Sequence, residues 1–183
     1  METWIRKEAL YRGRIFSLVT GEARLDDGGI VTREVIEHNG GVAIVPLVAD
    51  SVVLIRQFRI AIGREILELP AGRLEGDEDP EQRARQELEE EIGYRAARMI
   101  PVASYYSSVG FTNERMHIYL ALDLSETARK PESDERIASV RLSIPEVKLK
   151  LAARAFEDSK TIIGLREMLS YLEGSFRNDF QSR

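Results

Sequence analysis

The sequence predicts an α/β (α+β) fold in which helices cover both faces of a mixed β-sheet, with an antiparallel β region at the amino terminus. Strand-like segments come first, a helix is expected at residues 80–92, more strand-like segments follow, and two helices come last. This order is typical of an α/β/α sandwich. With 183 residues, of which 43% are hydrophobic and 31% charged, the chain suffices for one sizeable core.

The amino-terminal region, residues 1–39, is rich in β-favouring side chains, and Asp27-Gly28-Gly29 is a hairpin signal. The strands expected there are residues 4–11, 15–20 and 30–36. So small a meander buries little apolar surface alone. We therefore expect region 1–39 to pack on the main domain, residues 40–183, or on a partner chain.

Apolar stretches predict the strands of the main domain, and Pro46 predicts a bend or a sheet edge within the first of them. The strands expected are residues 41–48, 51–58, 97–107, 115–124 and 137–142. Ser143 and Glu146 have capping-box spacing and open a helix that is expected to reach about Phe156. Apolar periodicity predicts another helix at residues 159–173.

The helix at residues 80–92 has marked ends. Asp79 is suited to the N-cap, Pro80 to the first helical position and Gly93 to a left-handed C-terminal cap. Every fourth residue is apolar, which predicts one buried stripe of Ala84, Leu88 and Ile92.

Glu87, Glu90 and Glu91 lie at i, i+3 and i+4 and share the flank beside that stripe. Three carboxylates on one turn repel one another, and a hard divalent cation removes this repulsion. The alternative is a solvated acidic face. A glycine loop with Gly72 and Gly76 precedes the helix and permits close approach of backbone to a ligand. This combination favours a metal site.

Residues 72–94 resemble the Nudix box, G-x5-E-x7-R-E-U-x-E-E-x-G-U. The matching residues are Gly72, Glu78, Glu87, Leu88, Glu90, Glu91, Gly93 and Tyr94, and Gln86 replaces the arginine of the pattern. The resemblance implies hydrolysis of a nucleoside diphosphate linked to another moiety, with Mg²⁺ or Mn²⁺. It also implies that the metal ligands are Glu87, Glu90, Glu91 and the main-chain oxygen of Ala71.

Further segments resemble the ADP-ribose pyrophosphatase branch of that family. They are residues 11–15, 34–38, 53–59 and 68–72. The resemblance implies a homodimer with exchanged amino-terminal strands that help to hold the adenine, and we assign this contact to Arg14, Ile15 and Glu34. In the loop at residues 107–114, Gly110 and Phe111 match the branch, whereas Val109 replaces a proline that marks substrate class.

Arg56 and Arg59 come at the end of a predicted strand, with Arg64 beyond. Arginine side chains at such a place are suited to two-pronged phosphate contacts, and ordinary surface charge is the alternative. We therefore treat Arg56 and Arg59 as candidate substrate-binding residues.

The general base has two candidate sources. One is a glutamate of the box, Glu90 or Glu91, and the other is Glu135 in the acidic, apolar-free stretch at residues 125–136. In some members of the branch a loop glutamate has this role, and Glu135 aligns best with it.

Composition limits the partners. A net charge of −5 disfavours a broad nucleic-acid surface, and the absence of cysteine excludes disulfides and thiolate metal sites. His38 and His117 are too few for a histidine-rich zinc site. The sequence contains no 18-residue apolar run and no leader-like segment, so we expect a cytoplasmic protein with no membrane partner and a small-molecule nucleotide as substrate.

Three functions are compatible with these features of the sequence. The first is a metal-dependent pyrophosphatase for ADP-ribose or another nucleoside-diphosphate sugar. The second is a nucleotide sensor without turnover, for which Gln86 is the support. The third is a hydrolase of dinucleoside polyphosphates or oxidised nucleotides. Arg83 lies on the flank of the acidic cluster and is expected to supply the charge that Gln86 lacks.

Overall fold

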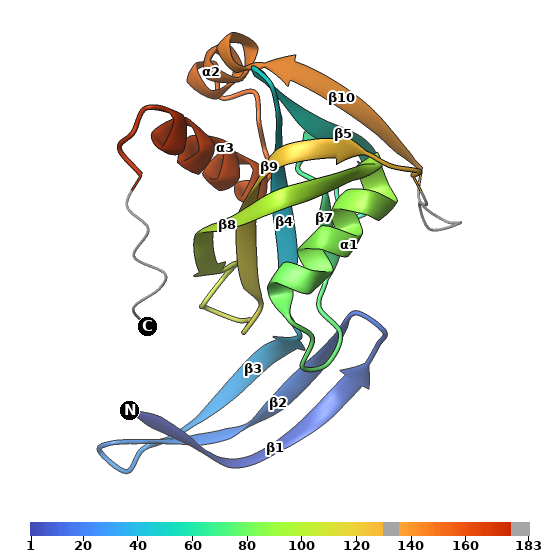
Figure 1. Cartoon of the computed structure of the whole chain (residues 1–183). Coiled ribbons are helices and arrows are strands. Elements are labelled where there is room, and N and C mark those ends of the chain that lie inside the picture. Colours follow the sequence, from blue (N-terminus) through green and yellow to red (C-terminus); the bar gives the residue numbers. More distant parts are fainter. Residues whose placement is uncertain (130–135, 177–183) are drawn as a thin grey trace. The chain divides into compact units, whose positions relative to one another are not determined.

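The computed structural model describes residues 1–129 and 136–176, and this part of the chain divides into two compact units. The first unit is Met1–Gly40 with Tyr105–Arg115, and the second is Gly41–Ser104 with the chain from Met116 onward. Figure 1 shows the elements of both units.

The first unit contains an antiparallel sheet in the order β1-β2-β3. Its strands are β1 (Glu2–Arg12), β2 (Phe16–Leu25) and β3 (Ile30–His38), each longer than the sequence predicts. Asp27 accepts a hydrogen bond of 2.9 Å from the Gly29 amide, and Gly28 has φ 87°, so the predicted hairpin turn is present. The only apolar side chains of these strands that are buried are those of Val19 and Ala23.

The loop at residues 105–115 is joined to β3 within this first unit. The Ile36 amide donates to the Phe111 carbonyl at 2.8 Å, and the His38 amide donates to Oδ1 of Asn113 at 2.8 Å. From sequence, this loop was expected in the region of residues 40–183. Its contacts with β3 join residues about 75 apart in the chain, and local sequence patterns cannot predict such contacts.

The second unit is built on a mixed sheet that has seven strands in the described part of the chain, in the order β10-β5-β4-β9-β8 with β6 beside β5 and β7 beside β4. The strands are β4 (Gly41–Val48), β5 (Ser51–Arg59), β6 (Arg64–Glu68), β7 (Ala71–Arg73), β8 (Tyr94–Tyr106), β9 (Arg115–Glu126) and β10 (Ile137–Ser143). β4 runs parallel to β9 and antiparallel to β5 and β7. The five predicted strands are confirmed, whereas β6 and β7 were not predicted.

Pro46 does not place β4 at a sheet edge, because β4 is central. On one side it pairs with β9 as far as Pro46, and on the other it pairs with β7 at residues 41–43 and with β5 at residues 47–48. Pro46 therefore lies where the strand changes partner on that second side, a place where a missing backbone N–H is tolerated.

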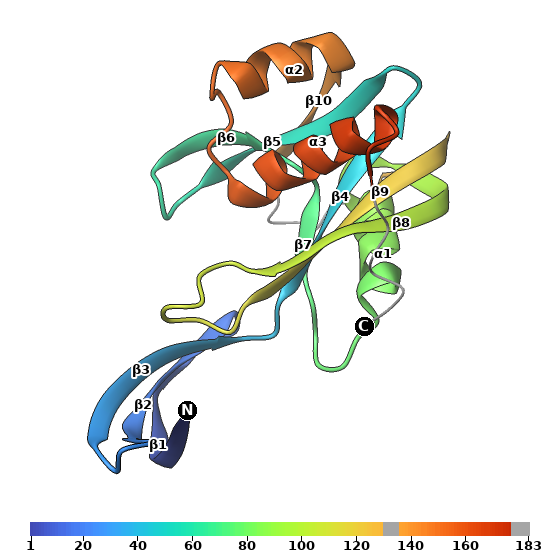
Figure 2. The same ribbon diagram turned by 90° about the vertical axis from the view of Figure 1, so that its left-hand side faces the viewer.

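Helices cover both faces of this sheet, as expected for an α/β/α sandwich (Figure 2). The helices are α1 (Pro80–Ile92), α2 (Ile144–Ala152) and α3 (Ser159–Leu172). Leu88 of α1 joins a buried cluster with Val42 and Ile44 of β4. Gly164 of α3 lies against Val45, the residue after Ile44 in β4, whose side chain points to the opposite face of the sheet.

The helix α2 begins with the predicted capping box of Ser143 and Glu146 but ends at Ala152, four residues before the predicted Phe156. Arg154 has φ 54°, a left-handed conformation that an α-helix cannot contain. The described helices include none that is long and apolar enough to span a membrane.

Candidate active site

The helix α1 is fixed at both ends by its own sequence. Asp79 accepts a hydrogen bond of 2.8 Å from the Gln82 amide, and Pro80 occupies the first helical position. Gly93 closes the other end at φ 73° and ψ 41°, with its N–H directed to the carbonyls of Leu88 and Glu89. The predicted bounds of 80–92 are therefore confirmed. Because both ends of α1 are fixed, the face of the helix on which each side chain lies is also fixed.

Two glutamates of the acidic cluster lie on the buried side of α1. Ala84 and Leu88 lie in the core, and on the flank beside them Glu87 is only 5% exposed and Glu91 only 1%. Glu90 stays half-exposed. The cluster is therefore not a solvated acidic face, because a buried carboxylate is costly unless it is bound by hydrogen bonds or by a cation.

The strand β7 holds these two carboxylates. The Ala71 amide donates to Glu91 at 2.9 Å. A Cβ atom at Gly72 would lie 1.6 Å from Oε1 of Glu87, so this carboxylate occupies the space that any other residue at position 72 would fill. The glycine of the loop is thus required by close packing of backbone against Glu87. The predicted metal-ligand role of the Ala71 oxygen stays a prediction.

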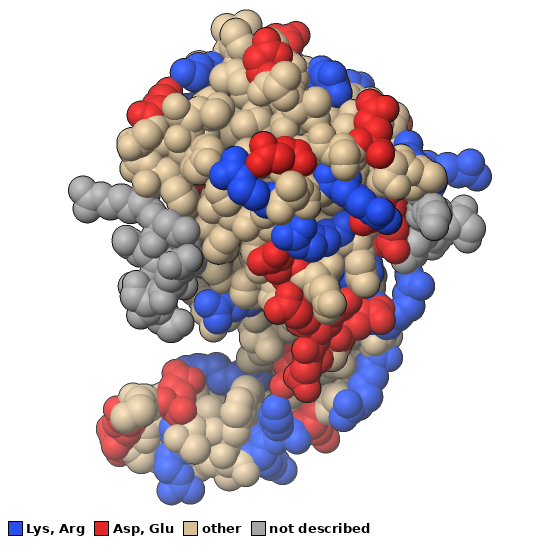
Figure 3. Space-filling view, viewed as in Figure 1, with Lys and Arg blue, Asp and Glu red and all other residues tan. Residues whose placement is uncertain are grey.

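Acidic side chains also gather over α1 and the loop before it, as Figure 3 shows. Glu75, Asp77 and Asp79 are exposed there, and Glu78 accepts a hydrogen bond of 3.2 Å from the Glu75 amide, which closes the loop. Such a concentration of one charge raises the local concentration of cations.

Arg83 is a cation that lies beside the acidic cluster. Its Nη2 contacts Oε1 of Glu87 at i+4, and its Nη1 lies 4.0 Å from Oε2 of Glu90. Gln86 is exposed and lies on the outer side of α1. A positive charge therefore stands beside Glu87, and it comes from position 83 as the sequence predicts.

The donor set of this flank fits a hard divalent cation. Glu87, Glu90 and Glu91 supply only carboxylate oxygens, which Mg²⁺ and Mn²⁺ prefer, and Gly72 leaves no side chain between β7 and Glu87. Within residues 1–129 and 136–176, no three acidic or histidine side chains converge closely enough to enclose a metal ion. The Arg83 guanidinium lies beside both Glu87 and Glu90.

Arg59 belongs to an ion-pair network around the buried Glu68 that the sequence did not predict. Its Nε and Nη2 donate to Glu68 at 2.7 and 2.9 Å, and Lys160 donates to the same carboxylate at 2.6 Å. The hydrogen bonds to Glu68, which is 1% exposed, raise the pKa of Arg59. The sequence contained one indication of this network, which is the single charged residue in the apolar stretch Ile66-Leu67-Glu68-Leu69.

The two candidate phosphate-binding arginines leave β5 on opposite faces. The pairing of β5 with β6 is regular from residues 55 to 59, and side chains three residues apart in a strand point to opposite sides. Arg56 is exposed, and Arg64 forms a two-pronged surface pair with Glu157 at 2.6 and 2.7 Å. The substrate roles of Arg56 and Arg59 stay predictions.

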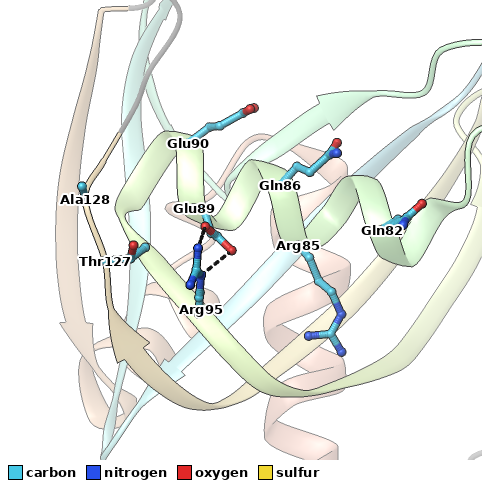
Figure 4. Close-up of a pocket in the computed structure, with 8 residues that line it drawn as sticks. All are labelled: Gln82, Arg85, Gln86, Glu89, Glu90, Arg95, Thr127 and Ala128. Carbon is cyan, nitrogen blue, oxygen red and sulfur yellow. Dashed lines mark hydrogen bonds and ion pairs between the residues drawn. The ribbon is translucent and has the colours of Figure 1, made fainter.

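A cavity of about 350 Å³ lies on the outer side of α1 (Figure 4). It is lined by Gln82, Arg85, Gln86, Glu89, Glu90, Arg95, Thr127 and Ala128. Arg85 is bound to Glu81 and to the Ala96 carbonyl, and Arg95 is bound to Glu89. Both arginines are thus neutralised by their own carboxylates, and Glu90 lies between this cavity and the contact of Arg83 with Glu87.

Beneath α1, Tyr119 of β9 cannot act as a base at neutral pH. Burial raises the pKa of Tyr119 to about 12, and the nearby charges of Asp79 and Glu81 add to the shift. The phenol therefore stays protonated.

The remaining candidates lie in the first unit or outside the described residues. Arg14 and Ile15 occupy the exposed turn between β1 and β2, and Glu34 lies in β3 opposite Thr20. Gly110 and Phe111 lie in the loop joined to β3. Glu135 falls outside the described residues.

Comparison with known proteins shows which family the chain resembles. The model of the NUDIX domain matches residues 37–163. The ADP-ribose pyrophosphatase of Bacillus subtilis is 33% identical over 168 residues, 90% of this chain and 91% of its own. The methanol dehydrogenase activator of Bacillus methanolicus is 34% identical over the same shares of the two chains.

A solved structure described as an ADP compounds hydrolase has the same fold. It superposes with a TM-score of 0.83, covers 94% of this chain and 95% of its own, and is 22% identical in sequence. Together with the matched domain, these similarities establish that the chain belongs to the Nudix family.

Proposed function

We propose that this protein hydrolyses the pyrophosphate of a nucleoside-diphosphate sugar, with ADP-ribose as the main substrate and AMP and ribose 5-phosphate as products. The observation that carries the proposal is the pair of buried carboxylates on α1, Glu87 and Glu91, packed against Gly72 and the Ala71 amide. The resemblance to an ADP-ribose pyrophosphatase over 90% of the chain supports this substrate class.

Mg²⁺ or Mn²⁺ is the proposed cofactor, held by Glu87, Glu90, Glu91 and the Ala71 oxygen. When bound, such an ion neutralises phosphate oxygens and lowers the pKa of a bound water. The contribution of the chain is to hold the carboxylates in a dry, fixed position through Gly72 and the Ala71 amide. Glu90 is half-exposed and Glu91 is buried, so Glu90 is the more accessible of these two candidates for removing a proton from the attacking water.

Substrate identity is tested by measuring release of the nucleoside monophosphate from ADP-ribose, ADP-glucose, GDP-mannose and NADH in the presence of Mg²⁺. The nucleoside monophosphate is GMP for GDP-mannose and AMP for the others. We expect turnover to be highest with ADP-ribose and to stop when the metal is chelated. Turnover of dinucleoside polyphosphates or oxidised nucleotides instead would replace the proposed substrate class. Binding without turnover of any of these compounds would favour a nucleotide sensor.

Glu135 provides a second source for the general base, and its substitution tests this source. Glu135→Gln is expected to lower kcat with little change in KM, because a base acts in the transition state. Steady-state kinetics on this variant, with Glu132→Gln as the matched control, check the assignment. An equal loss in both variants would move the role elsewhere in this stretch, and no loss in either would leave the role to Glu90.

We further propose a homodimer in which β1–β3 contribute to the interface. These strands expose large apolar side chains that a monomer would leave in water, among them Trp4, Ile5, Leu10, Tyr11 and Ile30. Light scattering is expected to give twice the chain mass of 20.8 kDa. Leu10→Glu should shift the protein towards monomer, whereas Ile60→Glu, in the exposed turn after β5, should not. A monomeric parent protein at micromolar concentration would contradict the proposal.

A further inference from the structure

We propose that Arg83 is the resident cation of the metal-free site, which holds Glu87 until a divalent cation binds and then leaves the carboxylates. The proposal rests on the metal-dependent function proposed above and adds to it a residue that sets how tightly the metal binds. Arg83 is a positioning residue in this account and not a catalytic one.

Position and charge are the first argument. The guanidinium contacts Oε1 of Glu87 and lies 4.0 Å from Oε2 of Glu90, so it is close to two of the three proposed ligands. Glu87 is almost fully buried, and a buried carboxylate needs a cation beside it. Gln86 cannot supply that charge, and Arg83 supplies it from one helical turn away.

The incomplete hydrogen bonding of Arg83 is the second argument. Arg59, Arg85 and Arg95 each bind one carboxylate through Nε and a terminal nitrogen together. Arg83 instead uses its terminal nitrogens, and its Nε is buried without a hydrogen-bond partner in the described part of the chain. An unpaired buried N–H is costly, so moving the Arg83 head into water recovers part of the cost of breaking its ion pair.

Competition for the same oxygens is the third argument. A divalent cation bound to Glu87 and Glu90 would lie within a few ångströms of the Arg83 guanidinium and would repel it. The side chain of Arg83 is already 21% exposed, and a long arginine stem can carry its head to solvent while its carbons stay packed. Exchange of one cation for the other leaves Glu87 with a cation beside it both before and after metal binding.

The test compares Mn²⁺ binding to the full chain by calorimetry in the parent protein, in Arg83→Met and in Arg85→Met. Arg85 is the matched control, because it lies on the same helix and pairs with Glu81 at 2.8 Å instead of the metal ligands. We expect Arg83→Met to bind Mn²⁺ at least about tenfold more tightly, because a nearby positive charge is removed. We expect Arg85→Met to stay within about twofold.

Thermal unfolding provides a readout that does not depend on activity. Without metal, Arg83→Met should unfold at a lower temperature than the parent protein, since Glu87 loses its cation. With saturating Mn²⁺ it should gain more than the parent protein does, because tighter binding gives greater stabilisation. Equal gains in the two proteins would contradict the exchange.

The outcomes separate this proposal from the function on which it rests. Equal or weaker Mn²⁺ binding by Arg83→Met, with normal binding by the parent protein, would overturn the exchange alone. No binding by either protein would overturn the proposed metal site as well. If Arg83→Met fails to fold, Mg²⁺ titration of the parent protein decides: the Nε–H NMR signal of Arg83 should shift while that of Arg85 stays, and an unchanged Arg83 signal would overturn the proposal.

Discussion

Replacing Glu87 or Glu91 by glutamine is expected to lower the turnover of ADP-ribose by at least about a hundredfold, because a metal ion stabilises much of the charge that develops in phosphoryl transfer. Both side chains are buried on α1 and lie against β7. Calorimetry with Mn²⁺ should show weakened binding in both variants.

The matched control is Glu89→Gln. Glu89 lies on the same helix and forms a two-pronged pair with Arg95 at 2.8 and 3.0 Å, on the side of the cavity in Figure 4. We expect its turnover to stay within about threefold of the parent protein, since surface ion pairs contribute little. Full activity in both Glu87→Gln and Glu91→Gln would remove the proposed site.

Gly72→Ala is the second change with a large expected effect. The added methyl group would lie 1.6 Å from Oε1 and 2.2 Å from Cδ of Glu87, so the carboxylate or the backbone of β7 must move. Overpacking of this kind costs about 1–3 kcal/mol of stability. Because Glu87 is displaced, we also expect turnover to fall by about a hundredfold or more.

The origin of the Gly72→Ala effect can be separated from a general loss of stability. In a Glu87→Ala background the three atoms nearest to the added methyl group are absent. Thermal unfolding should then show a smaller penalty for Gly72→Ala than in the parent protein, because the two positions are coupled. Equal penalties in the two backgrounds would show that the clash with Glu87 does not explain the effect.

Local patterns were sufficient to predict the bounds of α1 and the flank of this helix on which its glutamates lie. Caps at Asp79 and Gly93 defined the helix, and the spacing of Leu88 to Ala84 and Ile92 defined the buried side. The i+4 separation also identified Arg83 as a neighbour of Glu87. These features depend on residues within one or two turns of each other, so they can be read from the chain directly.

Features that depend on distant segments were missed. The short strands β6 and β7 exist because they pair with β5 and β4, and neither has a periodic pattern of its own. Glu68 is neutralised by Lys160, 92 residues away, and this partner cannot be read from the residues around Glu68. The reason for Gly72 also became clear only when Glu87 was seen against it.

The arginines of β5 show a further limit, because a sequence pattern does not give the direction of a side chain. Arg56 and Arg59 are close in the sequence, and each is a candidate substrate-binding residue. The two-residue period of a strand sends them to opposite faces, and Arg59 is engaged by Glu68. Their separation of three residues held this information, but it can be used only once the strand is known to be regular.

The position of the metal tests the central claim most directly. Crystals soaked in Mn²⁺, with anomalous scattering recorded at the manganese edge, locate the ion without reference to activity. We predict a peak bound by Glu87, Glu90 and Glu91 with the Ala71 oxygen, and an Arg83 side chain that has left Glu87. A peak elsewhere, or none at a Mn²⁺ concentration that supports turnover, would contradict the account.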